Sequence, residues 1–146
     1  MRLVVDASTL VAEALRARGR QLLAHPDLDL LVAEAAWSET EHELRKRVAL
    51  LVKHGHLAVA PATQLLDEVL ATLSERITLV PREVYSDRLA EAQRRIPRDP
   101  SDAPTVALAL TLECGIWTND RDFFGCGLPV WVTETLQSHL APEDEP

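Results

Sequence analysis

Apolar positions along the chain form two patterns, short continuous runs and longer stretches with helical spacing. Short apolar runs are typical of strands that are buried on both faces of a sheet. They predict strands at residues 3–5, 28–33, 77–80, 116–118 and 130–132. Stretches in which apolar residues recur every three or four positions indicate amphipathic helices. They predict helices at residues 8–18, 20–25, 34–53, 63–76, 84–95, 103–113 and 133–140.

Glycine and proline residues mark several of the predicted helix boundaries. Gly19 is expected to stop the first helix, Gly55 the helix at 34–53, and Gly115 the helix at 103–113. Pro104 falls in the first turn of that last helix, where the missing N–H of proline is tolerated. These signals divide the chain into elements of ordinary length.

Strands that alternate with helices predict an α/β fold with parallel pairing and helices on both faces of the sheet. The 146 residues are a usual length for one domain. We therefore expect a single three-layer domain at residues 1–140, with a central parallel sheet of about five strands, and a polar C-terminal tail at 141–146.

Composition and charge narrow the functional classes. The sequence has no apolar run near the roughly 18 residues that span a bilayer and no signal segment at its start, so we expect a soluble cytoplasmic protein without a membrane partner. The net charge of −8 argues against a protein that binds nucleic acid through a broad basic face. It does not argue against a nuclease, because clustered carboxylates can hold divalent cations that then receive phosphate.

Two aspartates directly follow predicted strands. Asp6 comes after the run 3–5, and Asp120 follows the run 116–118. In open α/β sheets, ligands bind at the carboxyl ends of the strands, so both residues are candidate metal ligands. The structural alternative for Asp6 is to cap the helix that opens at Ser8, and for Asp120 it is a cap or turn residue. Asp122 is expected to fill that capping role in preference to Asp120.

Asp102 lies at the start of the helix predicted at 103–113. A carboxylate is stabilised there by the helix dipole, so a purely structural cap is the alternative to a metal ligand. Asp99 is only three residues away, and two negative charges this close benefit from a cation or from Arg98. The pair favours a cation site.

Glu39 lies inside the helix predicted at 34–53. Glu43 has Arg47 at the stabilising i,i+4 spacing, whereas Glu39 has Glu43 there, a like charge that destabilises a helix. Glu39 therefore lacks the usual reason for a surface glutamate and is the fourth candidate ligand. Glu34 remains the alternative for this role.

Four segments of the chain carry a family resemblance. They are Leu3-Val4-Val5-Asp6-Ala7-Ser8, Trp37-Ser38-Glu39, the stretch from Arg98 to Ala109 that contains Asp99-Pro100-Ser101-Asp102, and the stretch from Ile116 to Phe124 that contains Thr118-Asn119-Asp120. In combination they resemble the PIN-domain nucleases over nearly the whole chain. Residues 54–95 match only in being helical with one strand.

The resemblance implies a site and a chemistry. It makes Asp6, Glu39, Asp102 and Asp120 an acidic quartet that binds Mg²⁺ or Mn²⁺ and is catalytic, with Asp122 as an auxiliary metal-binding acid and with the hydroxyls of Ser8 and Thr118 lining the site. It further implies hydrolysis of RNA phosphodiester bonds by a metal-activated water. Many bacterial members are toxins of the VapC type, so an antitoxin partner and a homodimer are expected.

Two other functions compete with this interpretation. A metal-dependent phosphatase of the haloacid-dehalogenase kind also places an aspartate after its first strand, but it needs a second aspartate two residues later, where this chain has Ser8. A non-catalytic interaction module on the same fold is the other alternative, because a fold does not by itself imply a function. Retention of all four acids argues against the module.

Overall fold

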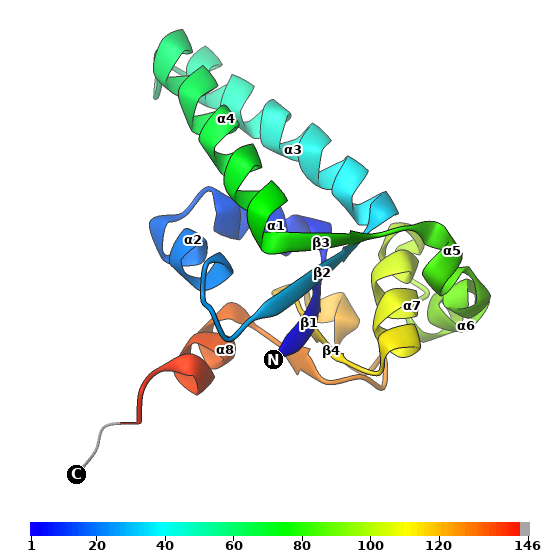
Figure 1. Cartoon of the computed structure of the whole chain (residues 1–146). Coiled ribbons are helices and arrows are strands. Elements are labelled where there is room, and N and C mark those ends of the chain that lie inside the picture. Colours follow the sequence, from blue (N-terminus) through cyan, green and yellow to red (C-terminus); the bar gives the residue numbers. More distant parts are fainter. Residues whose placement is uncertain (144–146) are drawn as a thin grey trace.

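The computed structural model, which describes residues 1–143, is built on one sheet of five strands in the order β3-β2-β1-β4-β5 (Figure 1). All four pairings between neighbouring strands are parallel. The strands are β1 (Arg2–Val5), β2 (Asp29–Ala33), β3 (Ile77–Val80), β4 (Gly115–Trp117) and β5 (Val130–Trp131). The predicted parallel α/β sheet is confirmed, including the number of its strands.

Helices flank this sheet. They are α1 (Ala7–Ala14), α2 (Ala17–Leu23), α3 (Glu34–Lys53), α4 (Val59–Arg76), α5 (Arg82–Tyr85), α6 (Leu89–Arg95), α7 (Ala103–Leu112) and α8 (Thr133–Leu140). Short 3₁₀ turns are η1 (Ser86–Arg88), η2 (Pro100–Asp102) and η3 (Arg121–Phe123). In Figure 1, α5, α6 and α7 lie to one side of the strands, α1, α2 and α8 lie to the other, and α3 and α4 extend together away from the sheet.

The core lies between the sheet and the helices next to it. Val4, Val5, Val32 and Ile116 of the central strands are fully buried, because helices cover both faces of the sheet. The stretch 106–109 of α7 is also buried at every position. The sequence of α7 is apolar all round, as expected for a helix enclosed by protein.

The C-terminal boundary predicted for the first helix is wrong. The helix expected at 8–18 is broken after Ala14, and α2 begins at Ala17. Gly19 lies inside α2 and does not stop a helix. A Cβ atom at Gly19 would collide with the backbone carbonyl of Glu13, so this glycine permits the close packing of α2 against α1.

Two other predicted helices have different bounds. α4 begins at Val59, four residues before the predicted start, because Pro61 falls in its first turn, where the backbone N–H has no helical partner. The helix predicted at 84–95 is divided into α5, η1 and α6. The division follows Tyr85, whose ring is buried, so tertiary packing overrides the continuous helical pattern.

Gly115 does not close α7 as predicted. The left-handed residue at the end of α7 is Glu113, with φ of 53°, and Gly115 is the first residue of β4. At Gly55 the prediction is confirmed, because this glycine follows α3 with φ of 75°, a conformation that L side chains rarely adopt.

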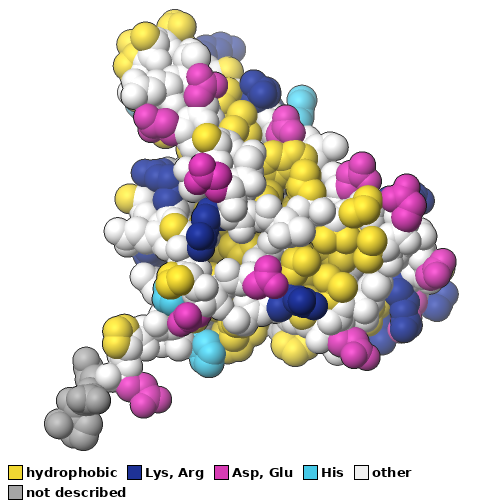
Figure 2. All heavy atoms as spheres, viewed as in Figure 1, with side chains coloured by type: hydrophobic (Ala, Val, Ile, Leu, Met, Phe, Trp, Pro, Cys, Tyr) yellow, Lys and Arg dark blue, Asp and Glu magenta, His cyan; other side chains and the backbone are white. Residues whose placement is uncertain are grey.

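One edge of the sheet leaves apolar side chains exposed. Leu79 of the edge strand β3 is 45% exposed, and Val84 of α5 is also exposed. Figure 2 shows hydrophobic side chains gathered over β3 and α5 on the face turned to the viewer. We call Leu79 and Val84 the β3 patch.

No helix in residues 1–143 combines the length and the apolar character needed to cross a membrane. The last helix ends at Leu140, where the predicted domain ends. Residues 144–146 of the predicted polar tail lie outside the described residues.

Candidate functional site

The carboxyl ends of β1 and β4 bring two of the predicted acids to one edge of the sheet. Val5 is paired with Trp117 in the parallel register, and the Asp6 backbone N–H donates to the Trp117 carbonyl at 3.4 Å. Asp120 follows Trp117 by three residues. Parallel pairing therefore positions the segments that carry both aspartates next to each other.

Asp6 is buried, with 2% of its surface exposed, and it caps α1. Its carboxylate accepts hydrogen bonds from the Thr9 backbone N–H at 3.3 Å and from the Ser8 hydroxyl at 2.7 Å. Burial raises the pKa of Asp6, while the hydrogen bonds from Thr9, Ser8 and Thr118 oppose that rise. The helix cap that the sequence analysis gave as the structural alternative for Asp6 is thus present. Asp6 also lies close enough to Asp102 and Glu39 to repel both.

The carboxyl group of Asp102 is strongly perturbed. Burial, together with repulsion from Asp99, Asp6, Asp120 and Glu39, raises its pKa to about 7. Although Asp102 occupies the N-cap position of α7, its side chain makes no capping hydrogen bond. The structural alternative for this residue therefore has no contact to support it. Asp102 is thus close enough to the other three acids of the predicted quartet to be repelled by each of them.

Glu39 and Glu34 have different surroundings, although both belong to α3. Burial raises the pKa of Glu39, and repulsion from Asp99, Asp6 and Glu43 raises it further. Glu34 lies in the first turn and accepts a hydrogen bond from the Arg82 backbone N–H at 3.2 Å. Glu34 thus joins α3 to α5, whereas Glu39 lies close enough to Asp6 and Asp99 to be repelled by them.

Asp120, and not Asp122, is the capping residue of the turn that follows β4. Asp120 caps η3 by accepting from the Asp122 backbone N–H at 2.9 Å, so the prediction that Asp122 is the cap is wrong. The Asp122 carboxylate instead pairs with Arg98 at 3.1 Å. The conformation of the turn is the reason. It directs the Asp120 side-chain oxygen toward the backbone N–H of Asp122 and the Asp122 side chain toward Arg98.

The sequence analysis considered Arg98 as a partner that could neutralise the Asp99–Asp102 pair. Because Arg98 pairs with Asp122, it does not do so. Asp99 is held by the backbone N–H and the hydroxyl of Ser101, at 2.9 and 2.8 Å, and these bonds lower its pKa. Within residues 1–143, Asp6, Glu39, Asp102 and Asp120 form no ion pair. We call these four residues the acidic edge.

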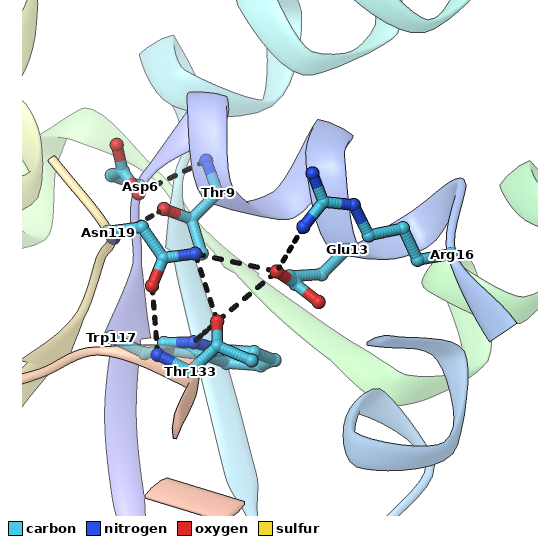
Figure 3. A network of polar contacts seen from close by, with 7 residues as sticks. All are labelled: Asp6, Thr9, Glu13, Arg16, Trp117, Asn119 and Thr133. Carbon is cyan, nitrogen blue, oxygen red and sulfur yellow. Dashed lines mark hydrogen bonds and ion pairs between the residues drawn. The ribbon is translucent and has the colours of Figure 1, made fainter. Parts of the chain in front are cut away.

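A hydrogen-bonded network beside the acidic edge was not predicted (Figure 3). The Asn119 backbone N–H donates to the Thr9 hydroxyl at 3.0 Å, and the Thr133 backbone N–H donates to the Asn119 side-chain oxygen at 2.8 Å. Thr133 Oγ1 and Asn119 Nδ2 both donate to Glu13 Oε1, at 3.2 and 3.4 Å. We call Thr9, Glu13, Asn119 and Thr133 the Glu13 network.

The network connects two members of the acidic edge. Thr9 contacts Asp6 through its N–H and Asn119 through its hydroxyl, and Asn119 directly precedes Asp120. Glu13 is fully buried, and its second oxygen, Oε2, has no hydrogen-bond partner among the described residues. The sequence signal for it was a glutamate on the apolar side of α1, between Leu10 and Ala14, which periodicity alone assigns to the core.

The acidic side chains do not form a tight cage. Among residues 1–143, no three histidine, cysteine, aspartate or glutamate side chains are grouped so that they could together hold a metal ion. This spacing suits an ion that keeps much of its water. Mg²⁺ is usually bound through one or two carboxylates, waters and substrate phosphate, and not by an all-protein cage.

Comparison with solved structures shows the same fold in three proteins. PAE2754 from Pyrobaculum aerophilum is 18% identical, with a TM-score of 0.63 over 95% of this chain and 88% of that chain. FitAB, solved bound to an IR36 DNA fragment, is 20% identical, with a TM-score of 0.58 over 90% and 94%. VapC20 from Mycobacterium tuberculosis, a toxin that cleaves the sarcin–ricin loop, is 19% identical, with a TM-score of 0.53 over 86% and 95%.

Sequence comparison identifies the family. No curated protein matches the chain at a significant level. The family model described as PIN domain matches residues 4–141, which include every acid of the predicted quartet and almost the whole described chain. The resemblance noted in the four sequence motifs is therefore confirmed, and the chain belongs to the PIN-domain family.

Proposed function

We propose that this protein is a divalent-metal-dependent endoribonuclease in which Asp6, Glu39, Asp102 and Asp120 hold Mg²⁺ or Mn²⁺. The observation that carries the proposal is the gathering of acidic residues at the carboxyl ends of β1 and β4, where burial and four acidic neighbours raise the pKa of Asp102 to about 7. Carboxylates crowded in this way are destabilised by mutual repulsion unless a cation joins them. Membership of the PIN-domain family supports the same function.

The donor set fits such an ion. Carboxylate oxygens are the hard ligands that Mg²⁺ and Mn²⁺ prefer, and within residues 1–143 no basic side chain pairs with the acidic edge. When bound, the ion would supply a nucleophilic water at neutral pH and would offset charge on the phosphate. Asp122, paired with Arg98, would be the auxiliary acid at the rim.

The chain's own residues would orient the reaction. Ser8 and Thr9 hold the Asp6 carboxylate through hydrogen bonds, and Thr118 accepts from the Asp120 backbone N–H at 3.0 Å. These contacts fix the Asp6 carboxylate and the backbone that carries Asp120 before substrate arrives, which reduces the reorganisation that binding requires. Attack of water on the phosphorus would break one P–O bond, and the leaving oxygen would take up a proton.

The two alternatives have less support. The phosphatase needs an acid two residues after Asp6, and Ser8 at that position donates a hydrogen bond to the Asp6 carboxylate. A non-catalytic module would have no need for a carboxyl group whose pKa lies near 7, because neutral side chains would avoid the repulsion at that edge. The nuclease is the function that uses this charge.

Cleavage of RNA by the Asp6→Asn variant tests the proposal. Asparagine caps a helix as well as aspartate does, so α1 and the fold are retained while a ligand charge is removed. We expect cleavage of RNA with Mn²⁺ to fall below a tenth of the wild-type rate. Asp67→Asn, an exposed aspartate on α4, is the matched control and keeps full activity. Activity of Asp6→Asn within tenfold of wild type would overturn the assignment.

We further propose that the protein is a toxin restrained by an antitoxin and that it forms a homodimer. The likeness of the fold to VapC20 and FitAB is the reason for proposing the antitoxin.

The exposed β3 patch supports a dimer, because an edge strand with apolar side chains is open to pairing. Light scattering after size exclusion should give a dimer for the wild type and a monomer for Leu79→Lys. If expression of this protein arrests the growth of the host cells, rescue of growth by co-expression of the neighbouring gene would support the antitoxin.

A further inference from the structure

A cavity of about 410 Å³ lies beside the acidic edge, on the side of the Glu13 network. Its lining includes Glu13, Asn119, Arg16, Arg18, Arg121 and Phe124. No member of the acidic edge lines it, so it is a separate hollow. Asn119 directly precedes Asp120, and Phe124 follows two residues after Asp122, so the loop that carries the acids also forms a wall of the cavity.

The floor of the cavity is fixed by hydrogen bonds (Figure 3). Asn119 and Thr133 bond to each other at 2.8 Å and 3.0 Å, and both donate to Glu13. The Trp117 ring nitrogen also donates to the Thr133 hydroxyl, at 3.1 Å. A polar floor connected in this way keeps its shape, and it spans α1, the end of β4 and the start of α8.

Three arginines, Arg16, Arg18 and Arg121, line the rim of the cavity together with one exposed acid, Glu134, although the whole chain has a net charge of −8. Arg18 and Arg121 are exposed and form no ion pair within residues 1–143. Arg16 lies 3.7 Å from Glu13 Oε1 and is 61% exposed, so its charge also reaches solvent. Guanidinium groups are well suited to phosphate oxygens, because they donate several hydrogen bonds in a fixed plane.

Phe124 adds an aromatic surface to this rim. It is 54% exposed, whereas the preceding Phe123 is fully buried in the core. Core packing therefore explains Phe123 and leaves Phe124 unexplained. Exposed aromatic rings next to arginines are the usual means by which proteins bind unpaired nucleotides, since any base can stack on the ring.

From these observations we propose that the cavity binds a nucleotide of single-stranded RNA next to the one that is cleaved. Its base stacks on Phe124, and its phosphate is held by Arg18 and Arg121. The inference rests on the proposed nuclease function, and it extends that function from the scissile phosphate to an unpaired neighbouring nucleotide. A duplex would not fit, because its bases are already stacked on one another.

Affinity measurements with four variants, two of them controls, test the inference. We expect Phe124→Leu and the double variant Arg18→Gln, Arg121→Gln each to weaken binding of a single-stranded RNA oligonucleotide about tenfold, within the range measured for loss of one stacking contact. Phe124→Tyr, which keeps the ring, should bind as the wild type does. Lys53→Gln, which removes one positive charge at the far end of α3, is the charge control and should leave the affinity unchanged.

The readouts separate this inference from the proposed function. Binding is measured by fluorescence anisotropy without added metal, so it does not depend on cleavage, and the KM for the oligonucleotide should rise with kcat nearly constant. Wild-type affinity in Phe124→Leu and in the arginine double variant would overturn the subsite, even if the wild type cleaves RNA. Equal losses for single-stranded and duplex RNA would also overturn it. Binding that responds to these variants without any cleavage would support the subsite and contradict the nuclease.

Discussion

The acidic edge and the Glu13 network both place carboxylates at the same end of the sheet, and the surroundings of those carboxylates are opposite. In the network, Glu13 Oε1 accepts from Asn119 and Thr133 and lies near Arg16. In the acidic edge, Asp102 has no capping hydrogen bond, and its neighbours are other acids. Donors stabilise a buried charge, and their absence leaves the charge to repel its neighbours.

The comparison separates structural from functional carboxylates. Glu13 is a buried acid whose hydrogen-bond donors make it part of the scaffold, and removing it should harm the fold. Asp102 is a half-buried acid surrounded by other acids, and the proposed cation would offset their repulsion. Variants of the two groups should therefore have opposite effects on stability and activity.

The largest effect is expected from removing charge at Asp102. Asp102→Asn should reduce metal-dependent RNA cleavage on the order of a hundredfold or more, since even outer partners of metal ligands are worth 10–100-fold. The apo protein should be as stable as the wild type or more stable, because repulsion is relieved. Cleavage rates and urea unfolding, measured on the same preparation, check both parts. Unchanged cleavage would remove Asp102 from the site.

Glu13 should behave in the reverse manner. Glu13→Ala leaves the buried Thr133 hydroxyl without its acceptor and removes one acceptor from the Asn119 amide, which should lower the free energy of unfolding by about 1–3 kcal/mol. Glu13→Gln keeps one side-chain oxygen to accept these bonds and should lose less. Urea denaturation gives both values. A Glu13→Ala protein as stable as the wild type would contradict the structural role of the network.

The pH dependence of the apo protein provides a third test. The folded-state pKa of Asp102 is raised from 3.8 to about 7, so the folded state holds this proton more tightly than the unfolded state does. Stability should therefore fall as pH rises through the window between these two values. Asp102→Asn should make the profile flatter over the same window. Thermal melts at half-unit pH intervals, without metal, measure the slope.

Metal should reverse this loss of stability near neutral pH. Mn²⁺ or Mg²⁺ that binds the folded state should raise the melting temperature by about 2–4 °C for each kcal/mol of binding. The gain should shrink toward pH 5, where protonation of Asp102 competes with the ion. Equal melting temperatures with and without millimolar metal at pH 7.5 would argue against a shared site.

The smallest effect distinguishes Glu39 from Glu34. Glu39→Gln should weaken Mn²⁺ binding and leave the apo protein equally or slightly more stable, since Glu39 is repelled by Asp99, Asp6 and Glu43. Glu34→Gln should leave metal binding unchanged and lower stability by a few tenths of a kcal/mol, about one interaction with the helix dipole. Isothermal titration with Mn²⁺ decides between them. The reverse pattern would place the second acid of the quartet at Glu34.

The sequence alone predicted the parallel α/β fold and the family. These follow from local signals, because a buried strand needs a continuous apolar run and a helix needs a repeating face. The ends of the predicted runs at Val5 and Thr118 also placed Asp6 and Asp120 near one edge, since parallel strands share their carboxyl end. The assignment of the quartet to a metal remains a prediction that the variants above test.

The tertiary structure decided which charges have partners. Arg98 could have neutralised Asp99 or Asp102, but the loop brings it to Asp122, 24 positions away. Glu13 bonds to Asn119 and Thr133, which are 106 and 120 positions away, and Gly19 is needed only because α2 packs against α1. Hydrogen bonding and electrostatic repulsion depend on distance in space, so such pairings are absent from any local pattern of residues and arise only when the chain is folded.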